Sequence, residues 1–95
     1  MSKYLTRIEL HNADQADYIK LHALMGKAGF SRVIEGSNGV QYNLPWAEYY
    51  CEGNFSTDAV LGAAKNAAKM TGRDSAVVTG QFTVLKWDGL TPVNK

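Results

Sequence analysis

The order of hydrophobic patterns along the chain constrains its fold more than any other feature. Alternating polar and apolar residues predict strands, and apolar residues at three- and four-residue intervals predict helices. By these patterns the chain runs strand, helix, strand, strand, helix, strand. This order is typical of a ferredoxin-like split β-α-β sandwich, in which two helices cover one face of a four-stranded antiparallel sheet. The expected bounds are 3–11, 13–28, 30–35, 47–52, 57–71 and 75–87.

The first strand shows the clearest alternation. Tyr4, Thr6, Ile8 and Leu10 point to one side, and mostly polar residues lie between them. The last strand also alternates, and the two helices each present one apolar face. The side chains expected to be mostly buried are Leu21, Leu24, Phe30, Val60, Val78 and Phe82.

Length and composition are those of a small globular α+β protein. The 95 residues predict one domain, with a core at about 3–87 and a flexible tail at 88–95. Hydrophobic residues make up 45% of the chain and charged residues 20%, which are globular values. The net charge of +1 argues against a strong, sequence-independent nucleic-acid binder, but a small site on a local patch is still compatible with it.

The sequence shows no targeting segment and no metal motif. The opening residues lack an apolar run of signal-peptide length, and no stretch approaches the ~20 apolar residues of a membrane helix. The single Cys51 cannot form an internal disulfide, and no carboxylates or histidines stand at metal-ligand spacing. We therefore expect a cytoplasmic protein without a cofactor.

Three side chains are candidates for acid–base chemistry. His22 flanks the apolar stripe of the first helix, where it could contact RNA or transfer a proton near neutral pH. Solvent exposure is the simpler interpretation of His22. His11 follows Glu9 at the end of the first strand, and such a pair is also common without any catalytic role. Asp14 stands at the start of the first helix, where helix capping is the alternative.

The segment 42–50 is the most unusual part of the sequence because it concentrates aromatic residues. Aromatic side chains on a hairpin or sheet face can stack on unpaired bases. They can equally form a protein interface or cover the edge of a small core. Trp46 and Tyr50 are therefore candidates for RNA binding. The hairpin around Trp46 is equally a candidate surface for a protein partner or a homodimer.

The stretch 21–64 contains an L-x-x-L-M run, a Phe-Ser strand start, a Gly-hydrophobic turn and a Leu before the third strand. In these motifs the chain resembles the GhoS family, small bacterial antitoxins that act as endoribonucleases. The match covers roughly half of the chain. The matching residues are Leu21, Leu24, Met25, Phe30, Ser31, Gly39, Val40 and Leu44.

The resemblance implies a ferredoxin-like domain that cleaves single-stranded RNA in a toxin–antitoxin or prophage setting. The family has an Arg at the position of His22, and an Asp near the end of the first strand, where this chain has Asn12 and Asp14. RNA can supply its own 2′-hydroxyl as the nucleophile. A histidine could then serve as the acid or base, and an arginine could hold a phosphate through paired donors.

Two functions are therefore expected as alternatives. One is a GhoS-like antitoxin or endoribonuclease acting on single-stranded RNA. The other is a non-catalytic protein-binding or dimerising module of the same fold, which the near-zero net charge favours. For the first function the expected catalytic residues are His22, Asp14 and His11, and the expected RNA-binding residues are Arg32, Arg7, Trp46 and Tyr50.

Overall fold

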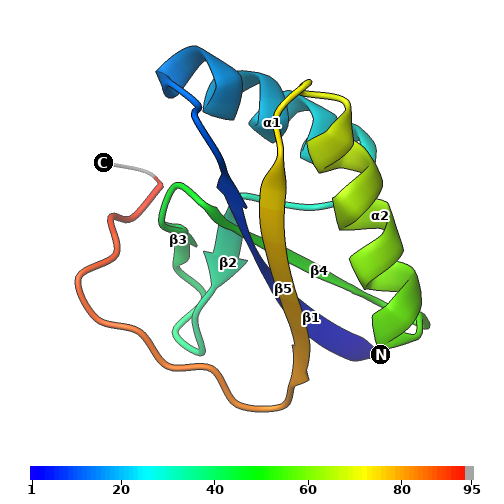
Figure 1. Ribbon diagram of the computed structural model, residues 1–95. Coiled ribbons are helices and arrows are strands. Elements are labelled where there is room, and N and C mark those ends of the chain that lie inside the picture. Colours follow the sequence, from blue (N-terminus) through cyan, green and yellow to red (C-terminus); the bar gives the residue numbers. More distant parts are fainter. Residues whose placement is uncertain (94–95) are drawn as a thin grey trace.

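The computed structural model describes residues 1–93, which form two helices and five strands (Figure 1). β1 is the centre of a three-stranded antiparallel sheet with the order β4-β1-β5, and β2 pairs with β3 in a separate hairpin. The fold is therefore α+β, as expected. The elements are β1 (Ser2–Leu10), α1 (Gln15–Lys27), β2 (Val33–Glu35), β3 (Gln41–Asn43), β4 (Glu48–Gly53), α2 (Thr57–Lys69) and β5 (Ser75–Phe82).

The expected single four-stranded sheet with two helices on one face is wrong, because the predicted strand at 30–35 does not join the sheet as a strand. Its link to β4 is one bridge, in which Ser31 and Tyr50 exchange backbone hydrogen bonds of 2.7 and 2.8 Å. The Ser31 hydroxyl then accepts from the N–H of Val33 and donates to its carbonyl oxygen. These local bonds bend the chain at residue 32, so that β2 pairs with β3 instead.

The hydrophobic core lies between β1, β4 and the two helices. β1 alternates as predicted, with Tyr4, Thr6, Ile8 and Leu10 buried. Side chains from both helices enter the same core, which explains why β1 is buried on only one of its faces. The helical residues of this core are Leu21, Met25, Val60, Ala64, Ala67 and Ala68.

The face of β5 that packs against the core is the opposite of the one expected from its apolar residues. Val78, expected to be buried, is 69% exposed, whereas Val77 packs against the core. In the β1–β5 register Val77 lies opposite Ile8 and Thr79 lies opposite Thr6, and directly opposed residues share a face of the sheet. On this face the hydroxyls of Thr79 and the fully buried Thr6 are 2.7 Å apart. Of the other expected core residues, Leu21, Phe30 and Val60 are buried, and Leu24 and Phe82 are half-buried.

The chain beyond β5 folds back instead of extending the strand. β5 ends at Phe82, not at the expected residue 87, and the chain then passes the β2–β3 hairpin (Figure 1). Thr91 and Val93 form backbone hydrogen bonds of 2.9 Å with β3. Residues 94–95 lie outside the described residues. In the part that is described, neither helix is long and apolar enough to cross a membrane.

Candidate functional site

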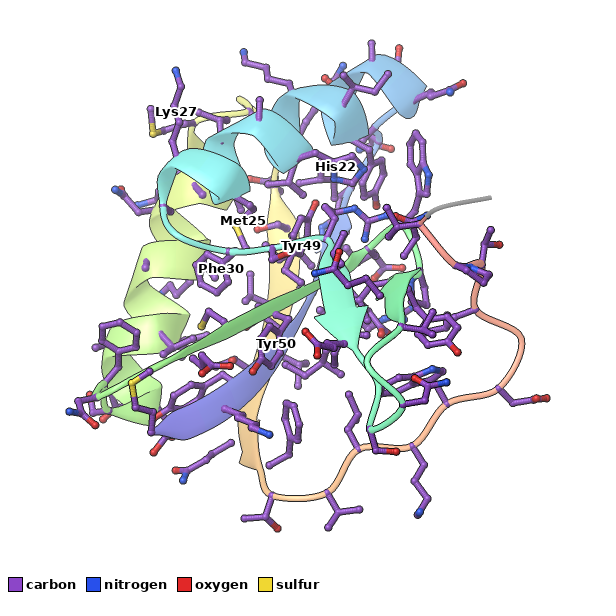
Figure 2. The ribbon with its side chains drawn as sticks, turned by 180° about the vertical axis from the view of Figure 1, so that it is seen from behind. His22, Met25, Lys27, Phe30, Tyr49 and Tyr50 are labelled. Atoms are coloured by element: carbon purple, nitrogen blue, oxygen red, sulfur yellow. The ribbon has the colours of Figure 1, made fainter. Side chains whose placement is uncertain are left out.

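His22 lies midway along α1 and points toward β4, so the expected solvent-facing alternative is not what the fold produces. Its Nδ1 is 2.7 Å from the hydroxyl oxygen of Tyr49, and Figure 2 shows the two side chains between α1 and the sheet. The Trp46 ring meets the imidazole edge-on, with 5.1 Å between the ring centroids. Arg32 completes the group, with its guanidinium carbon 5.6 Å from the centre of the Tyr49 ring. We call these four residues the His22 cluster.

Burial shifts the pKa values of His22 and Tyr49 in the His22 cluster. Burial, with a smaller contribution from the nearby Arg32 charge, lowers the pKa of His22, which favours neutral imidazole. Burial raises the pKa of Tyr49 to about 12, so its hydroxyl keeps its proton. The Nε2 atom of His22 is buried and has no hydrogen-bond partner within residues 1–93. In this conformation neither ring nitrogen is open to a substrate.

Arg32 is engaged by the backbone of the loop that leads into β4. Its guanidinium donates hydrogen bonds to the carbonyl oxygens of Leu44, Pro45 and Glu48 at 3.0, 2.6 and 2.7 Å. The carbonyl oxygens of Leu44 and Glu48 gain a charged donor in this way, and that of Pro45 accepts from Arg32 in addition to the N–H of Glu48. The arrangement explains the position of the loop and leaves Arg32 less able to hold a phosphate than the sequence suggested.

The other two candidate acid–base residues do not join His22. Asp14 caps α1: its side chain accepts from the N–H of Asp17, and the Asp17 carboxylate accepts in return from the N–H of Asp14. It also lies ~12 Å before His22 along the helix axis, at ~1.5 Å per residue. His11 is exposed at the end of β1, with its Nε2 4.0 Å from a Glu9 carboxylate oxygen. Within residues 1–93 neither residue shares a hydrogen bond, ion pair or ring contact with His22.

Arg7 and Tyr50 lie on the sheet face that points away from the helices. Arg7 forms an ion pair of 3.2 Å with Glu48 on the neighbouring strand. The Tyr50 hydroxyl donates to the Glu52 carboxylate, and burial together with this contact raises the pKa of Tyr50. The candidate RNA-binding residues are therefore divided between two places: Arg32 and Trp46 with His22, and Arg7 and Tyr50 on the open face.

A groove of about 1130 Å³ opens beside Tyr50, between the sheet face, the β2–β3 hairpin and the returning chain at 82–87. Two aromatic pairs line it. Tyr50 and Phe82 have ring centroids 6.1 Å apart, and Tyr42 and Trp87 have centroids 5.7 Å apart in an edge-to-face arrangement. We call this the aromatic groove. It joins rings from four separate segments of the chain.

The charges that line the aromatic groove are balanced. Lys3 and Lys86 contribute two positive charges, and Glu35 and Glu52 contribute two negative ones. A ligand would therefore gain little from net electrostatic attraction. The groove offers rings for stacking and polar side chains such as Asn38 and Gln41 for hydrogen bonding.

Neither a metal site nor a reactive thiol is formed by the described residues. Within residues 1–93, no three side chains of the His, Cys, Asp and Glu types lie close enough to hold a metal ion. Cys51 is buried in β4, and burial raises the pKa of its thiol, which disfavours the nucleophilic thiolate. The chemistry available is thus hydrogen bonding, stacking and exposed charge.

Comparison of the sequence with known proteins does not assign a function to this site. No model of a protein family matches the chain, and no curated protein matches it. The resemblance to the GhoS family therefore rests on the motif residues alone. Sequence reasoning identified Tyr50 and the aromatic segment 42–50 but did not place Phe82 and Trp87 beside them. Phe82 meets Tyr50 because β4 and β5 flank β1, and Trp87 meets Tyr42 because the chain returns to β3 after β5.

Proposed function

We propose that this protein binds single-stranded RNA in the aromatic groove, as a cytoplasmic GhoS-like antitoxin would. The observation that carries the proposal is the arrangement of the rings, with Tyr50 and Phe82 on the sheet and Tyr42 and Trp87 on the opposite wall. Unpaired bases can stack on such rings whatever their sequence, since every base has a π-face. Each stacked base contributes about 1–3 kcal/mol in proteins of this kind.

The strand arrangement supports a relationship to the ferredoxin-like fold. The Ser31–Tyr50 bridge places the start of the hairpin beside β4, on the edge opposite β1. If that bridge is counted as strand pairing, the strand order becomes β2-β4-β1-β5, with β3 as an additional strand on the hairpin. A ferredoxin-like β-α-β-β-α-β sandwich has its four strands in this order.

Cleavage of the bound RNA is the further activity that the resemblance implies. The aromatic groove lies on the open face of the sheet, whereas His22 contacts Tyr49 on the helix-covered face. We therefore propose binding by the groove, with no requirement for His22. A gel assay on the same labelled RNAs measures cleavage separately. Loss of cleavage in His22→Ala, with binding retained, would assign catalysis to His22 instead.

The two tryptophans provide a direct test, because one lies in each region. The Trp46→Phe protein keeps only Trp87, in the aromatic groove, and the Trp87→Phe protein keeps only Trp46, in the His22 cluster. Titration with a short oligouridylate should quench the fluorescence of the Trp46→Phe protein, because a base stacks beside the remaining indole. The fluorescence of the Trp87→Phe protein should change little.

Each other outcome of this titration has a defined meaning. Quenching of Trp46 alone would move the RNA site to the His22 cluster and contradict the groove. No quenching in either protein, with no shift of labelled RNA on a gel, would contradict RNA binding altogether. An RNA duplex of the same sequence serves as the control, since its bases are already stacked and should bind less well.

The alternative of a protein-binding or dimerising module is favoured by one observation. Trp46 is 47% exposed although it contacts His22 and Tyr18, so part of a large apolar ring faces solvent. If this surface mediates a homodimer, sedimentation should detect the dimer in the wild-type protein and a monomer in Trp46→Ala. Trp87→Ala is the matched control and should sediment as the wild-type protein does.

A further inference from the structure

β5 is an edge strand, and its outer side is open within residues 1–93, where it pairs only with β1. The N–H of His11 donates to the carbonyl oxygen of Asp74 at 2.7 Å, which fixes the alternation of the ladder. In an antiparallel pair, successive residues direct their backbone groups alternately toward and away from the partner strand. The outward backbone groups of β5 are therefore those of Ser75, Val77, Thr79 and Gln81.

The composition of β5 does nothing to block another strand. Natural proteins usually protect a free edge with charged side chains, proline, a bulge or short strand length. β5 has eight residues and contains no charged residue and no proline. Its edge is therefore able to form main-chain hydrogen bonds with a further extended segment.

A second groove, of about 370 Å³, lies beside this edge where α2 packs along β5 (Figure 1). Arg73 in this groove is already paired with Asp17 at 3.1 Å. Lys65 and Lys69 are exposed and form no ion pair within residues 1–93. We call it the α2–β5 groove; its lining includes Leu61, Lys65, Lys69, Arg73, Asp74 and Val77.

The spacing of the two lysines matches that of side chains on a strand. Lys65 and Lys69 are four residues apart on α2, which separates them by ~6 Å along the helix axis. Alternate side chains of an extended strand are ~6.6–6.8 Å apart. An added strand would point alternate side chains toward the helix side of the sheet, so that two successive ones could each reach a lysine.

We propose that the edge of β5 and the α2–β5 groove bind an extended acidic segment of a partner protein. The segment adds to the sheet as a strand and places alternate Asp or Glu side chains on Lys65 and Lys69. A second copy of β5 fits less well, because that strand has no acidic side chain to offer. RNA could place phosphates on the two lysines, but it has no peptide backbone to form hydrogen bonds with the outward N–H and C=O groups of β5.

The test uses a fluorescent peptide of the same length as β5, in which glutamate alternates with threonine, and measures its anisotropy with the full chain. The peptide should bind. A peptide with lysine in place of glutamate should bind at least about tenfold more weakly, since it reverses the charge complementarity. A glutamate peptide N-methylated at alternate residues should also lose about tenfold or more, because it cannot donate main-chain hydrogen bonds to the edge.

The protein side of the test uses exposed residues, so that folding is retained. Lys65→Glu combined with Lys69→Glu should weaken binding of the glutamate peptide about tenfold, whereas Lys20→Glu with Lys27→Glu on α1 should leave it unchanged. Equal binding of the N-methylated peptide would overturn strand addition. Failure of the glutamate peptide to bind would overturn the proposal. The proposal would also be overturned if oligouridylate displaced the peptide and the Lys65/Lys69 variant lost RNA binding, because the site would then be an RNA site.

Discussion

Tyr49 and Tyr50 are neighbours in β4, yet they belong to two regions with different capacities. Tyr49 is fully buried, and its hydroxyl is bonded to His22. Tyr50 faces the other side of the sheet, where its ring pairs with Phe82 beside an open groove. In the His22 cluster, the candidate residues His22 and Arg32 already form hydrogen bonds with other parts of the chain. In the aromatic groove, four half-buried rings line an open groove.

This difference can be tested by replacing each tyrosine with alanine. Tyr49→Ala removes a ring that is 0% exposed, and we expect it to lower the free energy of unfolding by about 3–5 kcal/mol. At ~4–8 °C per kcal/mol, the melting temperature should fall by roughly 12–40 °C. Thermal melts followed by circular dichroism measure this loss.

Tyr50→Ala is the matched control and should show the opposite balance. Its ring is only half-buried, so the loss of stability should be clearly smaller than for Tyr49→Ala. Its binding of oligouridylate should fall about 5- to 150-fold, as for the loss of one stacked base at ~1–3 kcal/mol. Equal losses of stability in the two variants, with RNA binding unchanged in Tyr50→Ala, would remove the distinction between the regions.

Arg32 in the His22 cluster and Arg7 on the open face should differ in their contribution to stability, by less than the two tyrosines do. Arg32→Ala leaves three carbonyl oxygens without their charged donor, and we expect a loss of about 2–3 kcal/mol in the free energy of unfolding. Arg7→Ala breaks an ion pair whose Arg side chain is 62% exposed, so its cost should be below ~1 kcal/mol. Urea denaturation of both variants measures the difference. Unchanged stability with weakened RNA binding in Arg32→Ala would restore Arg32 as a phosphate-binding residue.

The sequence predicts well those features that depend on a few adjacent residues. Ser56 caps α2 just before its expected start, with its hydroxyl accepting from the N–H of Ala59, and β1 buries the alternating side that its pattern indicates. Capping and alternation are local, since the partners lie within a few positions along the chain. The helix capping that was the alternative for Asp14 has the same origin.

Features that depend on distant segments could not be read from the sequence. The face that β5 presents to the core follows from its register with β1, and the sequence of β5 has apolar residues on both faces and so does not indicate which face is buried. The pairing of Trp87 with Tyr42 requires the chain to return to β3 after β5, and no local pattern marks that return. The aromatic groove therefore becomes visible only once the strands are placed.

The smallest expected effect is the response of the His22 cluster to pH. His22 has a pKa below its ordinary value of 6.5, with burial as the main cause and Arg32 as the second. The unfolded chain takes up this proton first as the pH falls below about 6.5, because its histidine is fully solvated. This contribution to stability is therefore constant above that pH and declines as the pH falls toward and through the lowered pKa. Tyr49 keeps its proton throughout this range, since its pKa is about 12.

Urea midpoints measured between pH about 8 and about 5 isolate the contribution of His22. The wild-type protein should lose more stability across this interval than His22→Asn, whose side chain does not titrate. His11→Asn is the matched control because it removes the other, exposed imidazole of the chain. The carboxylates titrate in all three proteins and cancel in the comparison. Parallel profiles for wild type and His22→Asn would mean that His22 is solvated in solution, which would make the His22 cluster as open to a ligand as the aromatic groove.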